Sequence, residues 1–314
     1  MIEAIKAALR YDPSPNPRVG AVLVDKDNKI KKITAHQKKG NDHAEYSLFK
    51  DTDISPDDTL YVTLEPCFHD DTSPSCASTV IQTGIKSVVI GDIDKDHRTN
   101  GKGINLLRKN NIEVLLEEGV NDFLNPGYKD SNTKPFLIGK IAISEDNFIY
   151  NENSKHISNS ESRKITHYIR STVDSIIIGK NTLIKDTPQL NVRLDDKFSS
   201  PTPIIIWGNN TKDLKTYKEK NSNFLFYVEN EEGSFNDYLF RNNIKTGLIE
   251  GGNKILSHFF EQKQIDKFYM FISDSDLKNG LKLDPNIQNS LDKDFILKGQ
   301  YQIKDNSLST YTIK

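Results

Sequence analysis

The sequence predicts a folded, soluble chain built from two α/β domains. Its 314 residues are about twice the usual length of a domain, so two separate cores are expected. Apolar runs of strand length alternate with polar, helix-like segments along most of the chain. A polar stretch ending at Lys134-Pro135 interrupts this alternation. We therefore expect domains at residues 1–127 and 135–314, joined by a linker at residues 128–134.

In the first half, the alternation begins with a strand over residues 19–25, followed by a turn at Lys26-Asp27-Asn28-Lys29. The later segments keep strand and helix in alternation. They are a helix starting within 43–50, a strand at 59–64, a helix at 76–83, a strand at 87–92, a helix at 103–109 and a strand at 112–116.

The second half repeats the α/β pattern without an internal repeat. Its expected elements are a strand at 136–143, a helix at 161–172, and strands at 175–179, 203–207, 224–228 and 247–250. No Gly-x-Gly-x-x-Gly follows a strand, so an ordinary Rossmann site is not supported. A nucleotide cofactor would have to bind in another way.

Composition argues against several classes of partner. Lys plus Arg number 42 and Asp plus Glu number 44, so the net charge is -2 and there is no overall basic footprint for a nucleic acid. No apolar run is long enough to span a bilayer, and Met1–Arg10 lacks the apolar core of a leader. Two cysteines in a long chain without a leader suit a reducing compartment. We expect a cytoplasmic protein without nucleic-acid or membrane partners.

The strongest chemical signal is a set of metal-type side chains. His43-Ala44-Glu45 opens a helix, and Cys67 and Cys76 follow a strand. One imidazole and two thiolates fill three tetrahedral zinc positions and leave the fourth for water, which is the arrangement of a catalytic site. Zinc lowers the pKa of such a water toward ~7, and Glu45 could move its proton. We also expect a helix start at Cys67 to favour its thiolate.

Other interpretations of these residues remain open. A closed structural zinc site would need a fourth ligand, and His36 and His69 are the candidates. The residues could also be a surface histidine, an ordinary helical glutamate and two buried thiols. The joint spacing favours a catalytic site.

The second half carries features that suit a phosphorylated ligand. Arg170 and Arg193 could bind a phosphate through paired hydrogen bonds. Gly251-Gly252, between a strand and a helix, would let backbone amides approach a phosphate. On spacing alone, loop glycines and surface arginines are the better explanation of these residues.

Together, the motifs resemble the family of bifunctional riboflavin biosynthesis deaminase/reductases. In the first half the resemblance covers Ser14–Val24, His43-Ala44-Glu45, Tyr61–Cys67, the eight-residue gap before Cys76, and Gly101-Lys102-Gly103-Ile104. Cytidine and tRNA deaminases typically keep the cysteines two to four residues apart, which argues against that alternative. The family implies a cytidine-deaminase-like three-layer domain with His43, Cys67 and Cys76 as zinc ligands and Glu45 as general acid/base. It also implies Asn16 and His69 in the substrate pocket, although Asn16 could instead be a turn residue.

In the second half the resemblance rests on Lys140–Ser144, Arg170, Asp174, Gly179, Thr182, the segment from Asp186 to Arg193, and Glu250-Gly251-Gly252. It implies a dihydrofolate-reductase-like domain in which NADPH reduces the ribose chain of a phosphorylated aminopyrimidine. The implied substrate contacts are Lys140, Ser154, Arg170, Leu190, Arg193 and Glu250. The implied cofactor contacts are Ala142, His156, Thr182, Asp186 and Gly252. A homo-oligomer is also expected.

Departures from the family pattern keep two alternatives open. The family's Ser-Leu-Asp-Gly is Ser144-Glu145-Asp146-Asn147 here, and His156 stands where a tryptophan is usual. The region after Lys267 lacks the family's Ala-Pro and Gly-Gly elements, so a trimmed far end is expected. The alternatives are a deaminase with a degenerate reductase domain, and a non-catalytic binding module that zinc stabilises.

Overall fold

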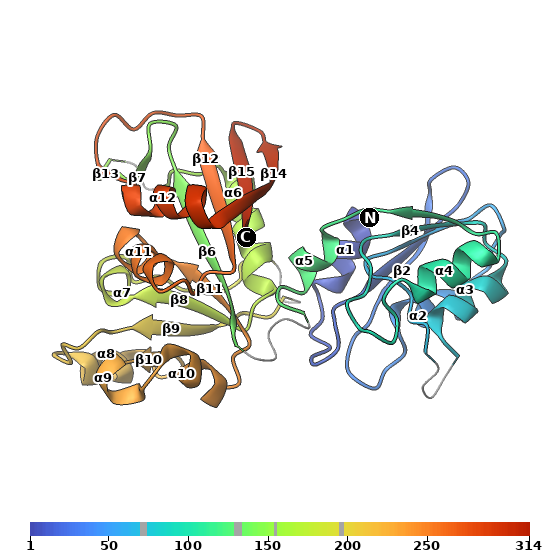
Figure 1. The fold of residues 1–314 in the computed structure, drawn as a ribbon, viewed down its shortest axis with the longest axis horizontal. Helices are drawn as coiled ribbons and strands as arrows, with labels where there is room; N and C mark the ends of the chain where they lie inside the picture. Colours follow the sequence, from blue (N-terminus) through green and yellow to red (C-terminus); the bar gives the residue numbers. More distant parts are fainter. Residues whose placement is uncertain (70–73, 129–133, 154–155, 195–197) are drawn as a thin grey trace. The chain divides into compact units, whose positions relative to one another are not determined.

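Two large β-sheets, each with its own helices, and one small two-stranded sheet make up the fold (Figure 1). The computed structural model describes residues 1–69, 74–128, 134–153, 156–194 and 198–314. Among these, residues 1–128 with 198–199 form one unit, and residues 134–194 with 200–314 form the other. Both units mix strands and helices, as expected from the sequence. Most of the linker predicted at 128–134 lies outside the described residues. No helix in the described ranges is long and apolar enough to cross a membrane.

The first unit contains a five-stranded sheet in the order β2-β1-β3-β4-β5. Strand β1 runs antiparallel to both of its neighbours, whereas β3, β4 and β5 are parallel. The turn between β1 and β2 forms because Asn28 adopts a positive φ of 61° and Asp25 accepts hydrogen bonds from the Asp27 and Lys29 amides. The strands are β1 (Gly20–Val24), β2 (Ile30–Ala35), β3 (Thr59–Val62), β4 (Ser87–Ile90) and β5 (Glu113–Leu116).

Helices cover both faces of this sheet, which gives three layers. Every residue of β1 is buried. Ala21 and Leu23 pack with Leu48 of α2 on one face, whereas Val22 packs with Ala4 of α1 on the other. This alternation of sides follows from the two-residue period of a strand. The helices are α1 (Ile2–Ala8), α2 (Ala44–Phe49), α3 (Cys76–Thr83), α4 (Lys102–Lys109) and α5 (Val120–Leu124).

The second unit is organised around an eight-stranded sheet in the order β10-β9-β8-β11-β6-β12-β15-β14. The first six strands in this order are parallel to one another. Strand β15 runs antiparallel to its two neighbours, β12 and β14. A separate pair, β7 (Phe148–Tyr150) and β13 (Leu281–Lys282), lies outside it. The sheet strands are β6 (Phe136–Ile143), β8 (Ser175–Gly179), β9 (Thr202–Ile206), β10 (Leu225–Tyr227), β11 (Thr246–Glu250), β12 (Lys267–Ser273), β14 (Phe295–Ile303) and β15 (Asn306–Ile313).

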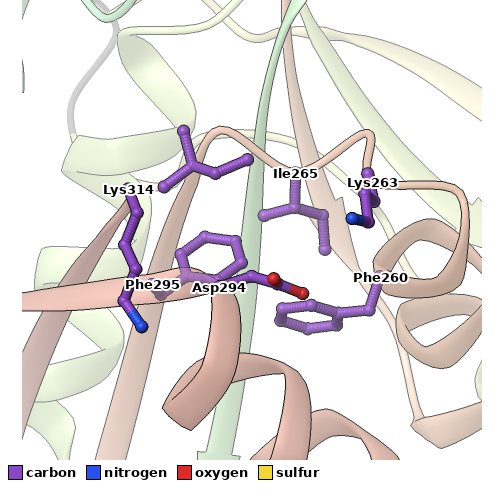
Figure 2. A pocket seen from close by; sticks show the side chains of 7 residues that line it. Phe260, Lys263, Ile265, Asp294, Phe295 and Lys314 are labelled. Atoms are coloured by element: carbon purple, nitrogen blue, oxygen red, sulfur yellow. The ribbon is translucent and has the colours of Figure 1, made fainter.

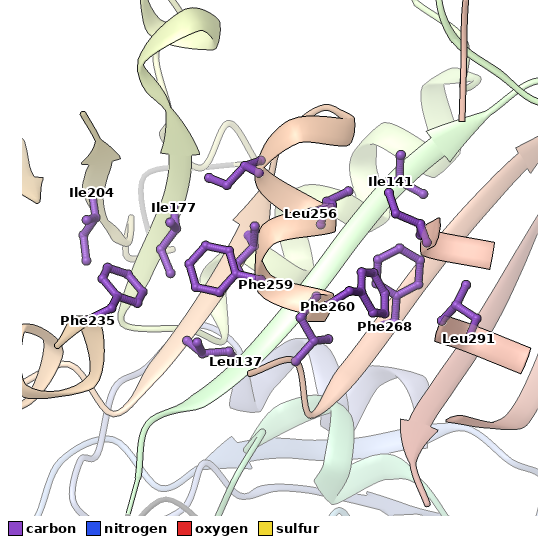
Figure 3. Packing of buried hydrophobic residues seen from close by; sticks show 14 of the residues in the cluster. Leu137, Ile141, Ile177, Ile204, Phe235, Leu256, Phe259, Phe260, Phe268 and Leu291 are labelled. Carbon is purple, nitrogen blue, oxygen red and sulfur yellow. The ribbon is translucent and has the colours of Figure 1, made fainter. Parts of the chain in front are cut away.

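The larger core of this unit lies between the sheet and three helices (Figure 3). Phe259 and Leu256 project from α11 against Ile177 and Ile141 of the sheet, and Phe235 of α10 packs beside Ile204. A second cluster, on alternate residues of β8 and β9, includes Trp207. The helices are α6 (Ser160–Ser171), α7 (Lys180–Asp186), α8 (Leu214–Lys220), α9 (Glu229–Glu232), α10 (Phe235–Arg241), α11 (Asn253–Glu261) and α12 (Pro285–Asp294).

The expectation of a trimmed far end is wrong. Strands β12, β15 and β14 pair over their lengths and complete one side of the sheet. Strand β14 is an edge strand, and most of its residues are exposed. The absent family motifs therefore do not correspond to absent strands, because backbone pairing here does not depend on those residues.

Candidate active sites

His43, Cys67 and Cys76 come together in the first unit. Their ligand atoms all lie within 4.8 Å of one another. His43 Nδ1 is 3.3 Å from Cys76 Sγ and 3.7 Å from Cys67 Sγ. Zinc bonds of ~2.1 Å to nitrogen and ~2.3 Å to sulfur place such atoms about 3.5 Å apart around a tetrahedral ion. The donor set therefore fits zinc, and Nδ1 is the imidazole atom that faces the sulfurs.

Local backbone geometry brings the histidine and the glutamate to one place. His43 is the N-cap of α2, with an extended backbone, and Glu45 lies in the first turn. Because His43 is outside the regular helix, the wide angle between residues i and i+2 does not separate the two side chains. Glu45 is only 3% exposed, and burial raises its pKa to about 7 while the charge of His43 opposes this rise. Glu45 is thus a buried carboxyl group beside the metal-type ligands.

The expected helix start lies at Cys76 and not at Cys67. Cys76 is the first residue of α3, and its backbone N–H donates to Cys67 Sγ across 3.2 Å. A hydrogen bond from the Cys76 thiol, with help from His43, lowers the pKa of Cys67 to about 4. The same contact and burial raise the pKa of Cys76. The thiol and the backbone amide of Cys76, at the start of α3, therefore favour the thiolate form of Cys67.

Neither candidate for a fourth ligand joins this cluster. Within the described ranges, the group of metal-type side chains consists of His43, Cys67 and Cys76. Both ring nitrogens of His36 have other partners, because Nδ1 lies 3.1 Å from the Asp42 carbonyl and Nε2 lies 3.1 Å from Asn16 Nδ2. His69 Nδ1 lies 3.4 Å from Thr99 Oγ1. This arrangement favours the open, catalytic type of site over a closed structural one.

A pocket of about 170 Å³ is lined by His43, Glu45 and Cys67 together with Asn16 and His69. Asn16 lines this pocket and also ends a turn, because its amide donates to the Pro13 carbonyl. Four further lining residues were not expected from the sequence, namely Asp94, Asp96, Arg98 and Tyr128. They come from loops distant in sequence from the metal motifs, and only the Gly101–Ile104 motif pointed to that region.

Glu65 fixes the loop that carries these additional residues. Its buried carboxylate accepts three backbone hydrogen bonds, from Asp94 and Gly101 to Oε2 and from Ile104 to Oε1, at 2.9–3.1 Å. A Cβ on Gly103 would lie 2.2 Å from the Pro66 carbonyl oxygen, so only glycine permits this approach. These two features explain the Gly-x-Gly-Ile segment as a support for the pocket.

In the second unit, three predicted substrate residues form a charged cluster. Arg170 of α6 binds Glu250 of β11 with two hydrogen bonds, Nε to Oε1 at 2.6 Å and a terminal nitrogen to Oε2 at 3.0 Å. Lys140 of β6 is the register partner of Glu250. Burial opposes ionisation of Glu250, but Arg170 and Lys140 outweigh it and hold its pKa below the usual range. Burial lowers the pKa of Lys140.

The segment with Leu190 and Arg193 is attached to this cluster. Arg170 donates to the Asn191 carbonyl at 3.0 Å, and the Arg193 amide donates to His167 Nδ1 at 3.3 Å. Leu190 is buried, whereas Arg193 is exposed. Burial, followed by the charges of Arg170 and Arg193, lowers the pKa of His167 to about 4. His167 was not singled out from the sequence, because a lone helical histidine carries no distinctive pattern.

The residues expected to bind the cofactor are more dispersed. Ala142 is half-buried in β6, Thr182 and Asp186 lie on α7, and Gly252 is the N-cap of α11. His156 is exposed, and Ser154 lies outside the described residues. Strands β11, β8 and β9 are parallel neighbours, so Gly252 and the start of α7 follow their carboxyl ends at one edge of the sheet. Ligands of open α/β sheets bind at this kind of edge, which is compatible with a dinucleotide.

A second cavity, in the other unit, contains none of the predicted residues (Figure 2). It measures about 240 Å³, and Figure 2 shows Phe260, Ile265 and Phe295 grouped around it with Asp294. Lys263, Ile313 and Lys314 complete its lining.

Both halves of the chain match known protein families. Residues 1–92 match the family model of the cytidine and deoxycytidylate deaminase zinc-binding region, and residues 135–273 match that of the RibD C-terminal domain. The riboflavin biosynthesis protein RibD of Aquifex aeolicus (strain VF5) is 31% identical over 300 residues, which cover 86% of this chain and 84% of that protein. A diaminohydroxyphosphoribosylamino-pyrimidine deaminase of Buchnera aphidicola subsp. Schizaphis graminum is 39% identical over 119 residues, covering 37% of this chain and 80% of that protein.

A solved structure extends the similarity over both units. The diaminohydroxyphosphoribosylaminopyrimidine deaminase/5-amino-6-(5-phosphoribosylamino)uracil reductase of Thermotoga maritima superposes with a TM-score of 0.67 at 28% identity. The alignment covers 100% of this chain and 96% of that one. The similarity thus includes a zinc-type deaminase half and a reductase half.

Proposed function

The chain belongs to the RibD family of riboflavin biosynthesis proteins, and from this premise we propose that it catalyses two successive reactions on one phosphorylated aminopyrimidine. The first is hydrolytic loss of the 2-amino group of 2,5-diamino-6-(5-phosphoribosylamino)pyrimidin-4-one. The second is NADPH-dependent reduction of the ribosyl chain to a ribityl chain. The observation that carries the first reaction is the cluster of His43, Cys67 and Cys76, with the Glu45 carboxyl group buried in the same pocket.

In the deaminase half, His43, Cys67 and Cys76 would hold zinc. The ion, when bound, supplies Lewis-acid activation of water near neutral pH. Glu45 would accept a proton from the attacking water and deliver it to the departing amino group, which leaves as ammonia. Asn16 and His69, which line the pocket, would orient the pyrimidine. His36 supports this geometry because its Nε2 contacts the Asn16 amide nitrogen.

In the reductase half, the bound cofactor supplies hydride to C1 of the ribose chain. Lys140, Ser154, Arg170, Leu190, Arg193 and Glu250 would position this chain. The Arg170 guanidinium already binds Glu250 and the Asn191 carbonyl, so the phosphate contact falls to Arg193. Arg193 is exposed, and it donates to the neutral amide oxygens of Gln189 and Asn191. A phosphate would bind more strongly than these neutral acceptors.

The cofactor would contact Ala142, His156, Thr182, Asp186 and Gly252. Gly252 supports this assignment because its exposed backbone follows β11 at the carboxyl edge of the sheet. Hydride transfer needs two carbons held in near-attack geometry and no dedicated nucleophile. A rigid charged cluster beside that edge meets this requirement.

We also propose the limits and the setting of the protein. The deaminase domain would span residues 1–127, the linker 128–134 and the reductase domain 135–314. The protein would be a cytoplasmic homo-oligomer. Its two cysteines are free thiols, and their place in the metal cluster suits a reducing compartment.

Three measurements on the purified chain test this function. We expect about one zinc per chain, ammonia release from the diaminopyrimidine, and NADPH oxidation only with the deaminated intermediate. Ammonia release without NADPH oxidation would leave a deaminase with a degenerate reductase domain. Zinc without either activity would favour the binding module. Faster turnover of cytidine or tRNA would contradict the assigned substrate.

A further inference from the structure

Lys180 and Trp207 meet at the carboxyl ends of two neighbouring strands. Gly179, the last residue of β8, pairs with Ile206, the last residue of β9. Lys180 and Trp207 are the next residues in each case, and the Lys180 ammonium lies 4.2 Å from the centre of the indole ring. The register of the two strands therefore fixes a cation against an aromatic face at this edge of the sheet.

The Trp207 indole has a buried donor without an acceptor. Trp207 is 3% exposed, and its Nε1 is the one buried side-chain nitrogen or oxygen atom in the described part of the chain that has no hydrogen-bond partner. A buried tryptophan usually gives its N–H a partner, because leaving it unpaired costs about 1–3 kcal/mol. An unpaired buried donor calls for an explanation, and its place beside a ligand-binding edge makes an acceptor from a ligand the one we consider.

Lys180 likewise has only weak, neutral acceptors. Its ammonium lies 3.4 Å from the carbonyl oxygens of Asn210 and Lys212, both in the loop that follows Trp207. Across the described residues, no carboxylate lies within ion-pair distance of Lys180, and Lys212 adds a second exposed cation to this loop. Lys180 and Lys212 therefore bring two cationic donors to this place, where exposed Asp213 follows Lys212.

This cationic position lies on the edge already assigned to the dinucleotide. Strand β11, with Gly252 after it, is the other neighbour of β8, and Lys180 begins the helix that carries Thr182 and Asp186. We propose that Lys180 and the Trp207 indole bind the phosphate on the adenosine ribose of NADPH, the group that NADH lacks. Lys180 would exchange its two long carbonyl contacts for phosphate oxygens. This inference rests on the proposed reductase function and assigns its cofactor preference to these two residues.

The single tryptophan of the chain makes the site observable without turnover. Because Trp207 is the only tryptophan, its emission reports ligand binding at this position. Wild-type protein would be titrated with NADPH, NADH, 2′,5′-ADP and ADP. We expect tighter binding of NADPH than of NADH, and of 2′,5′-ADP than of ADP. Lys180→Met should weaken NADPH and 2′,5′-ADP by about tenfold and leave NADH and ADP within about twofold.

Two further variants separate charge from folding. Lys180→Arg keeps the cation and should retain the preference for NADPH. Lys218→Met removes an exposed charge of α8 in the same unit and should bind all four ligands like the wild type. Equal loss of NADPH and NADH in Lys180→Met, or no loss of either, would overturn the inference while leaving the reductase assignment in place. Wild-type protein that binds neither dinucleotide would overturn the reductase assignment, and this inference with it.

Discussion

The backbone amide of Cys76 points at the sulfur of Cys67, 3.2 Å away, so the second cysteine helps to hold the first through its main chain. Cys76 is thus a predicted ligand through its side chain and a support through its backbone. Loss of its sulfur should affect the metal more than the local fold, because the amide remains.

Replacement of Cys76 by serine is expected to release zinc. The variant should lose most of its bound zinc and its ammonia release, because a hydroxyl is a poor substitute for a thiolate ligand. NADPH oxidation with the deaminated substrate should persist, since the reductase residues belong to the other unit. Metal content by mass spectrometry and the two separate activity assays check this outcome. Retention of stoichiometric zinc would contradict the ligand assignment.

Glu45→Gln should separate metal binding from catalysis. We expect zinc content to stay near the wild-type value, while ammonia release falls by about 10²–10⁴-fold because the proton carrier is lost. The matched control is Glu113→Gln, which changes an exposed glutamate of β5 in the same unit. If Glu45→Gln deaminates at the wild-type rate, the proposed proton transfer is wrong.

Glu65→Gln should weaken the pocket by damaging its supporting loop. The carboxylate of Glu65 accepts hydrogen bonds from three backbone N–H groups, and the NH2 group of a glutamine cannot accept them. We therefore expect the free energy of unfolding to fall by about 1–3 kcal/mol. The Michaelis constant for the diaminopyrimidine should rise, because Asp94 and its neighbours lose their anchor. Urea unfolding and steady-state kinetics measure the two effects. An unchanged unfolding midpoint would show that these hydrogen bonds contribute little.

The Arg170–Glu250 pair should behave as one unit. We expect Arg170→Met and Glu250→Gln each to abolish most of the reductase activity, and the double variant to lose little more. A double-mutant cycle on the free energy of unfolding should give a coupling of about 1–3 kcal/mol, because either single change leaves a largely buried charge without its hydrogen-bonded ion-pair partner. Additive effects would mean that the two groups act independently.

The neutral state of His167 should make stability depend on pH. The unfolded chain takes up this proton near pH 6.5, whereas the folded chain resists it until about pH 4. The unfolded state therefore binds more protons in this window, and the free energy of unfolding should fall as the pH falls through it. His167→Gln should show a smaller decline between about pH 7 and about pH 5 in urea titrations. His258→Gln, at an exposed position, should decline like the wild type.

The sequence predicted the α/β class, about half of the helices and strands, and part of the sites. Apolar runs identified strands such as β1 and β8, whose residues are buried on both faces. No strand was predicted at β12, although it is buried as well, or at β14, whose edge position leaves most of its side chains exposed. Spacing predicted the cluster of His43, Cys67 and Cys76, since metal ligands constrain residue types strongly.

The missing parts depend on long-range contacts. Arg98 lines the first pocket because Glu65 anchors a loop about thirty residues away in sequence, and Tyr128 reaches it from the turn after α5. The sequence predicts Trp207 at the end of a strand, but only the structure shows that its indole N–H lacks an acceptor. No local pattern encodes which loop will approach a site or which acceptor a buried N–H will lack.

Lys140 and Glu250 occupy matching positions in adjacent parallel strands, β6 and β11. Because side chains alternate between the faces of a strand, one residue inserted or deleted in either strand upstream of these positions would send one member of the pair to the opposite side of the sheet. Evolution can thus lengthen or shorten the loops around these strands, but the number of residues in the strands themselves is fixed. Among relatives that retain the second reaction, we expect length variation to avoid residues 136–140 and 246–250.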